Sequence, residues 1–88
     1  MYEIEFPAYL EGYEVETESK GYLVDLIVRN EGKEWNVTVY DPARLAQEIS
    51  DELENASCFA VSNLLVVPVV TKDAIRAALA ESGAACFE

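Results

Sequence analysis

Apolar side chains fall on every second residue over residues 2–6, and this alternation predicts a strand that ends at Pro7. Residues 13–18 alternate in the same way, with glutamates on one face and apolar or β-branched side chains on the other. Residues 22–29 are almost continuously apolar, which is typical of a central strand with both faces partly covered. The segment 30–33 contains a glycine that can adopt a positive φ angle, so it predicts a hairpin loop after this third strand.

A fourth strand is predicted over residues 35–40, where Trp35 shares a face with two valines. That alignment favours a place for Trp35 in the core between sheet and helices, and an aromatic anchor at an interface is the alternative. Tyr40 has the opposite parity, together with an asparagine and a threonine. We therefore expect Tyr40 on the face of the sheet that the chain leaves uncovered.

At Asp41 and Pro42 the spacing of apolar residues changes from two to about 3.6, the period of a helix. Asp41 can accept hydrogen bonds from the first amides of a helix, and proline fits the first helical position without losing a hydrogen bond. The predicted helix carries one apolar stripe, formed by Leu45, Ile49, Leu53 and Ala56. A stripe of this kind is typical of a helix that packs on a core.

The last third of the chain predicts one more strand and one more helix. Residues 63–67 form a short, apolar and β-branched run, and we expect an inner strand there. Thr71 can cap a helix over residues 72–82, and Gly83 would end it. The remaining residues 84–88 are apolar enough to pack against the domain.

The element order is four strands, a helix, a strand and a second helix, which predicts one α+β domain over residues 1–88. The first helix is long enough as a crossover to place the last strand parallel to a neighbour. We expect a two-layer sandwich in which both helices cover one face of a mixed, mostly antiparallel sheet. The opposite face of the sheet would then be polar or would match a partner.

Composition excludes several classes of function. The 88 residues include six lysines and arginines against seventeen aspartates and glutamates, which gives a formal charge of −11. Nucleic acids and anionic membrane surfaces both attract basic faces, so neither partner is expected. The 51% share of apolar residues indicates a folded chain in spite of the acidity. With no visible secretory signal and no long apolar run, the expected location is the cytoplasm.

The sequence contains no histidine, and this removes several catalytic mechanisms. Ser-His-Asp and Cys-His systems need an imidazole, and the common zinc sites need histidine or paired cysteines. Cys58 and Cys86 are interpreted as small buried side chains, with a disulfide or a reactive thiol as the alternatives. The glycines are isolated, so the sequence has no phosphate-binding loop. We expect no cofactor, no metal site and no enzymatic activity.

The negative charge is concentrated in the first 57 residues, which hold fourteen acidic and four basic side chains, a net charge of −10. Residues 58–88 hold three and two, a net charge of −1. Alternate residues of a strand share a face at about 6.6–6.8 Å, so the first two predicted strands would carry rows of carboxylates. The acidic positions are Glu3 and Glu5 on the first strand, Glu14, Glu16 and Glu18 on the second, and Glu48, Asp51, Glu52 and Glu54 on the first helix.

Other interpretations of these acids remain open. Glu48 and Glu52 are one helical turn apart with Asp51 beside them and could bind a hard cation, but no Asp-rich loop or second acidic helix completes such a site. Paired carboxylates could act as the acid and base of a glycosidase, which would require a cleft and one desolvated acid. The acids could also be an ordinary solvated face that keeps a small domain in solution.

We expect a small binding protein that captures a basic protein through its carboxylate rows, in the manner of inhibitors, immunity proteins and decoys, a comparison based on size and charge. The alternative is a homodimeric structural domain, in which the open sheet face or edge pairs with a second copy and the acids serve only solubility. The expected contact residues are Glu3, Glu5, Glu14, Glu16, Glu18, Tyr40, Glu48, Asp51 and Glu52.

Overall fold

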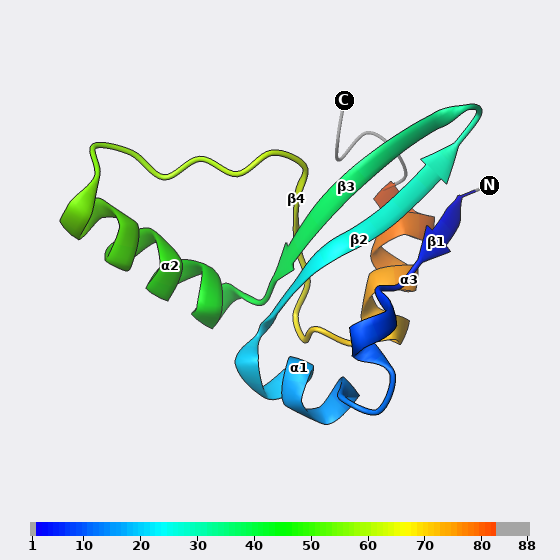
Figure 1. The fold of residues 1–88 in the computed structure, drawn as a ribbon, viewed down its shortest axis with the longest axis horizontal. Coiled ribbons are helices and arrows are strands. Elements are labelled where there is room, and N and C mark those ends of the chain that lie inside the picture. Colours follow the sequence, from blue (N-terminus) through cyan, green and yellow to red (C-terminus); the bar gives the residue numbers. More distant parts are fainter. Residues whose placement is uncertain (1, 83–88) are drawn as a thin grey trace.

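A four-stranded sheet forms the centre of the fold, and Figure 1 shows the helices around it. The structure is a computed structural model that describes residues 2–82. Its elements are β1 (Glu3–Glu5), the short 3-10 helix η1 (Ala8–Leu10), α1 (Glu14–Lys20), β2 (Tyr22–Asn30), β3 (Lys33–Tyr40), α2 (Pro42–Asn55), β4 (Leu64–Val66) and α3 (Lys72–Ser82). The predicted α+β class with a mixed sheet is confirmed.

The strands lie in the order β1-β2-β3-β4 across the sheet. β1 and β3 both run antiparallel to β2, and β4 runs parallel to β3, as expected for a strand reached through a helical crossover. The apolar segment 22–29 therefore lies centrally, as predicted. The strand predicted at residues 63–67 is present as β4, but its predicted inner position is wrong, because β4 forms one edge of the sheet.

The β2–β3 hairpin turns within two residues. Asn30 pairs with Lys33, and Glu31 and Gly32 between them have φ angles of 51° and 80°. Two positive φ angles are the geometry of a type I′ turn, whose twist matches that of the flanking strands. The predicted hairpin loop is confirmed.

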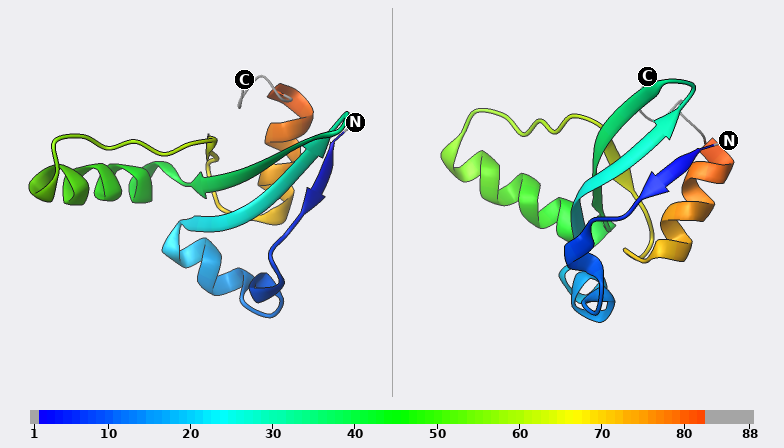
Figure 2. Two further views of the ribbon diagram at one scale, coloured as in Figure 1. Left: turned by 45° about the horizontal axis from the view of Figure 1, so that its top comes forward. Right: turned by 45° about the vertical axis from the view of Figure 1, so that its right-hand side comes forward.

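One face of the sheet forms the core together with α3, which lies along that face in Figure 2. Ile75 and Leu79 of α3 are buried, and Trp35 packs against the same cluster, so the core interpretation of Trp35 is confirmed. The hydroxyl of Thr71 accepts a hydrogen bond from the amide of Ala74 (3.1 Å), which confirms the predicted cap. The buried apolar residues of the sheet are Leu23, Leu26, Val28, Val37, Val39 and Leu65.

Residues 13–18 are mostly helical, and the prediction of a strand there is wrong. α1 ends at Gly21, whose φ of 77° is the left-handed conformation typical of a helix C-cap. Glutamate is a good helix former, and the glutamates of the first turn lie near the positive end of the helix dipole. The alternation does not follow burial, because Val15 is 76% exposed and Thr17 is the residue of α1 that is buried.

α2 begins as predicted but does not cover the sheet. Oδ1 of Asp41 accepts a hydrogen bond from the amide of Arg44 (2.7 Å), and Pro42 occupies the first turn. No residue of α2 is buried, and Figures 1 and 2 show the helix extending past the end of the sheet. The expected arrangement with both helices on one face is therefore right for α3 and wrong for α2. A stripe on a helix shows which side is apolar, but not which surface it meets.

The predicted helix stop at Gly83, the tail 84–88 and Cys86 lie outside the described residues. Within residues 2–82, no helix has the length and the apolar character needed to cross a bilayer.

Candidate functional site

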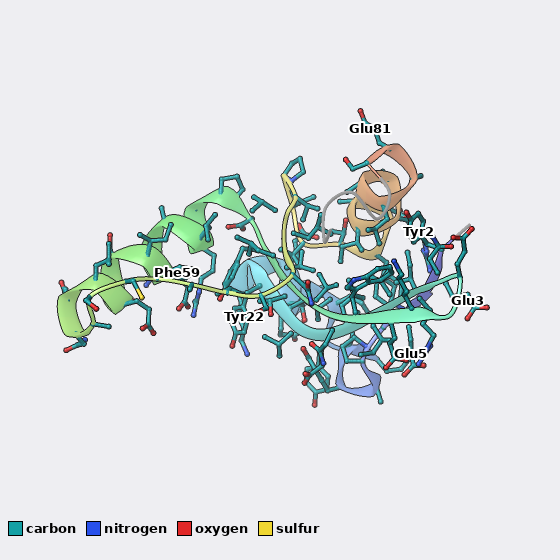
Figure 3. All side chains as sticks on the ribbon, turned by 90° about the horizontal axis from the view of Figure 1, so that it is seen from above. Tyr2, Glu3, Glu5, Tyr22, Phe59 and Glu81 are labelled. Atoms are coloured by element: carbon teal, nitrogen blue, oxygen red, sulfur yellow. The ribbon has the colours of Figure 1, made fainter. Side chains whose placement is uncertain are left out.

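α2 presents an apolar stripe that the rest of the described chain covers only in part. Ile49 is 36% exposed and Leu53 is 52% exposed, while Leu45 is half-buried. Apolar stripes of this kind normally pack against a core. Residues 56–63 return from α2 to β4 beside the helix, and they carry the partly buried Phe59 (Figure 3). The C-terminal half of the stripe is left open to solvent.

Carboxylates border this stripe on one side. Each residue advances about 100° around a helix, so Glu48 and Glu52 lie together beside Ile49, and Asp51 lies on the side of Glu48 that faces away from the stripe. Arg44 is the one basic residue in the helix. The exposed part of α2 is therefore an apolar surface with an acidic margin.

Arg44 links the first turn of α2 to Tyr22 on β2. Its Nη2 and Nε atoms lie 2.6 Å and 2.8 Å from Oε1 of Glu48, and its guanidinium lies 4.6 Å from the ring centroid of Tyr22. A cation over an aromatic face is attracted by the ring, so this contact steadies the first turns of the helix. Glu48 thus has an internal partner. Asp51 and Glu52 are exposed and have no ion pair within residues 2–82.

Tyr40 is buried, with 9% of its surface exposed, so the expectation that it faces an open surface is wrong. It lies at the end of β3, just before α2 begins, and the charges of Glu48, Arg44 and Glu52 on α2 act on its hydroxyl. Burial raises the pKa of the Tyr40 hydroxyl, and the carboxylate of Glu48 raises it further, while Arg44 acts in the opposite direction. Tyr40 is therefore not an exposed contact residue.

Glu14, Glu16 and Glu18 do not form a row. Residues two apart on a helix point in nearly opposite directions, so Glu16 lies on a different side of α1 from the other two. Oε1 of Glu14 is 3.9 Å from Nζ of Lys72 on α3. Glu14 and Glu18 line a hollow of about 310 Å³ against α3, whereas Glu16 lines another of about 410 Å³ beside Tyr9. The predicted carboxylate row on this segment is therefore wrong.

Glu3 and Glu5 do share one face of β1, as alternation requires. Arg29 of β2 lies beside them: its Nη1 atom is 3.1 Å from Oε1 of Glu5, and its Nε atom is 2.7 Å from Oε1 of Glu34. These hydrogen bonds, the one to Glu34 first, raise the pKa of the Arg29 guanidinium. Figure 3 shows Glu3 and Glu5 at the opposite end of the molecule from α2, so the expected contact residues do not form one surface.

The possible metal ligands within residues 2–82 lie apart, and Cys58 lies at the surface. No three histidine, cysteine, aspartate or glutamate side chains within residues 2–82 gather closely enough to hold a metal ion. Cys58 is exposed on the segment after α2, so its interpretation as a buried side chain is wrong.

One further surface contains none of the expected contact residues. The stretch from Asn55 to Thr71 contains no aspartate, glutamate, lysine or arginine, although 26% of the whole chain is charged. It includes the edge strand β4 and the exposed side chains of Val66 and Val69. The uncharged run was the signal in the sequence that marks this surface.

Comparison of the chain with protein-family models, with curated protein sequences and with solved structures found no match in any of the three.

Proposed function

We propose that this chain is a non-enzymatic binding domain that captures a basic protein partner on α2. The supporting observation is the exposed pair Ile49 and Leu53 beside the carboxylate of Glu52, which has no ion pair within residues 2–82, with Asp51 farther around the acidic side of the helix. An apolar stripe supplies contact area that holds a partner, and a charged margin selects the sign of that partner's charge. The complementary surface is an amphipathic segment with lysine or arginine next to apolar residues.

The charge of the whole chain acts in the same direction. A net charge of −11 on 88 residues creates a field that speeds the approach of a basic surface, and salt screens that field. A second copy is a poor occupant of α2. An antiparallel pair of these helices would place the Glu48 and Glu52 margin of one against the same margin of the other.

The test uses a synthetic amphipathic helical peptide with leucines on one face and lysines on the other. The double variant Asp51→Asn, Glu52→Gln should bind it with a several-fold lower association rate and a weaker dependence on salt, measured by stopped flow. Leu53→Ala should mainly raise the dissociation rate, because it removes contact area and no charge.

The matched control is Glu16→Gln, Glu18→Gln on α1. Both double variants change the net charge from −11 to −9. A local acidic margin on α2 predicts that the α1 variant binds nearly as fast as the parent chain. If the two variants slowed association equally, the association rate would depend only on the net charge of the chain, and this would contradict a site on α2. A peptide in which glutamates replace the lysines should not bind.

A further inference from the structure

β4 leaves one edge of the sheet open among the described residues. The amide of Thr38 donates to the carbonyl oxygen of Asn63 (3.1 Å), and the amide of Val67 donates to the carbonyl oxygen of Tyr40 (3.0 Å). Backbone groups alternate in direction along a strand, so those of Leu64 and Val66 point away from β3. No strand within residues 2–82 pairs with them. An outward row of this kind is a template for another strand.

The two edges of the sheet differ in how they resist such pairing. β1 carries charged Glu3 and Glu5 in its three residues, and charge on an edge strand discourages a second strand from adding to it. β4 carries Leu64, Leu65 and Val66 and has no charge. Val66 is 42% exposed, and Val69 beyond it is 47% exposed. β4 therefore lacks the charged side chains that protect β1 from pairing with another strand.

The distribution of charge favours a second copy of this chain over a basic protein as the partner of this edge. Two chains of net charge −11 repel each other over most of their surfaces. The uncharged stretch Asn55–Thr71 is where two copies can approach with the least repulsion. A basic partner, in contrast, gains no attraction there. A strand paired with its own copy in antiparallel orientation also satisfies two-fold symmetry, the commonest symmetry of homodimers.

We propose that two copies of this chain pair through the outer edges of β4, so that one sheet continues across the dimer. In the antiparallel register that uses the outward groups, Leu64 lies opposite Val66 of the partner subunit, and the two residues exchange both backbone hydrogen bonds. The two-fold axis passes near Leu65. The side chains of Leu64 and Val66 then cover each other on the outer face of the sheet. This surface is separate from the α2 margin, so it does not depend on the proposed partner.

The first experiment measures the mass of the purified chain by light scattering over a range of protein concentrations at low and high salt. The expected result is a dimer that dissociates on dilution and becomes tighter as salt screens the repulsion between copies. Capture of a basic peptide on α2 has the opposite salt dependence, so failure of one proposal is distinguishable from failure of the other. A mass that stays monomeric at every concentration and salt overturns the dimer.

Val66→Lys places a charge on the edge, and Val15→Lys makes the same change on exposed α1. Both change the net charge from −11 to −10, so equal weakening of the dimer would contradict pairing through β4. We expect Val66→Lys to be monomeric and Val15→Lys to dimerise like the parent chain.

Hydrogen exchange on the parent chain keeps the test decisive if Val66→Lys fails to fold. The amides of Leu64 and Val66 should become protected as the protein concentration rises, because the partner's strand accepts their hydrogen bonds. The amide of Val67, which already donates to Tyr40, should not change with concentration. Exchange at Leu64 and Val66 that is independent of concentration refutes the pairing.

Discussion

Gly21 and Asp41 are in direct contact at the point where α1 ends and α2 begins. The amide of Asp41 donates a hydrogen bond to the carbonyl oxygen of Gly21 (2.8 Å), and a Cβ atom at Gly21 would lie 2.5 Å from Oδ2 of Asp41. The Asp41 carboxylate also caps α2 through the amide of Arg44. Position 21 therefore requires glycine for its left-handed φ and for the space that Asp41 occupies.

Gly21→Ala should destabilise the fold by about 2–3 kcal/mol, since it combines about 1–2 kcal/mol of left-handed strain with about 1 kcal/mol for a displaced helix cap. Urea denaturation measures the loss. Gly12→Ala is the matched control, because Gly12 has a φ of 79° but has nothing within 4 Å of an added Cβ. It should show the strain alone. Equal losses in the two variants would mean that the contact with Asp41 contributes nothing.

Tyr9 takes the place of a strand partner for Val24. The Tyr9 hydroxyl donates to the carbonyl oxygen of Val24 (2.7 Å) and accepts from its amide (3.1 Å). β1 pairs with β2 only between Ile27 and Arg29, so this part of β2 would otherwise be an open edge. Tyr9→Phe should cost about 1 kcal/mol, the usual net contribution of such hydrogen bonds, and should speed amide exchange at Val24.

Tyr13→Phe is the control for this change. Tyr13 is exposed and lines the same hollow as Tyr9, but its hydroxyl has no hydrogen bond within residues 2–82. We expect its stability and its Val24 exchange rate to match the parent chain. If Tyr9→Phe leaves the Val24 amide equally protected, the hydroxyl is not the partner that covers this edge.

The elements that could be predicted are those whose cause is local. Asp41 and Thr71 are caps because their side chains reach the first amides of their own helices. The β2–β3 hairpin needs only a two-residue turn, which Glu31 and Gly32 supply. The strand prediction over residues 13–18 failed because alternation indicates a strand only where one face of the segment is buried. Val15, on the face predicted to be apolar, is exposed to solvent.

The candidate site was less predictable because it depends on how elements meet. The stripe on α2 was visible in the sequence, but its exposure follows from the direction in which the helix leaves β3. Tyr40 had the predicted parity, yet it is buried, and the charges of Arg44 and Glu48 on the next element act on its hydroxyl. The uncharged run over residues 55–71 was visible in the sequence, but the place of β4 at the edge was not, because strand order is set by long-range pairing that no local pattern encodes.

Leu53→Ala on α2 should lower the free energy of unfolding by less than about 1 kcal/mol, because a side chain that is 52% exposed loses little buried area. Leu79→Ala on α3 makes the same substitution in a helix, where the side chain is 1% exposed, and it should cost about 2–5 kcal/mol. Thermal or urea unfolding followed by circular dichroism compares them. A large loss for Leu53→Ala in the monomer would show that α2 packs on its own domain.

Stability should fall at alkaline pH, and Tyr40 should account for part of the fall. Tyrosine in the unfolded chain ionises near pH 10, whereas burial and the nearby Glu48 raise the pKa of folded Tyr40 above that value. Above pH 10 the unfolded state therefore binds fewer protons than the folded state. The free energy of unfolding then decreases as pH rises, until the folded pKa is reached.

Tyr40→Phe should flatten this decrease while leaving the pH dependence below about pH 9 unchanged, because the lost proton titrates only near pH 10 and above. Burial also raises the pKa of Tyr9, so a smaller slope should persist in the single variant and decline further in Tyr9→Phe, Tyr40→Phe. Urea midpoints at a series of pH values measure the slope. A Tyr40→Phe curve parallel to that of the parent chain above pH 10 would show that Tyr40 ionises equally in both states, and that the base of α2 does not shield it.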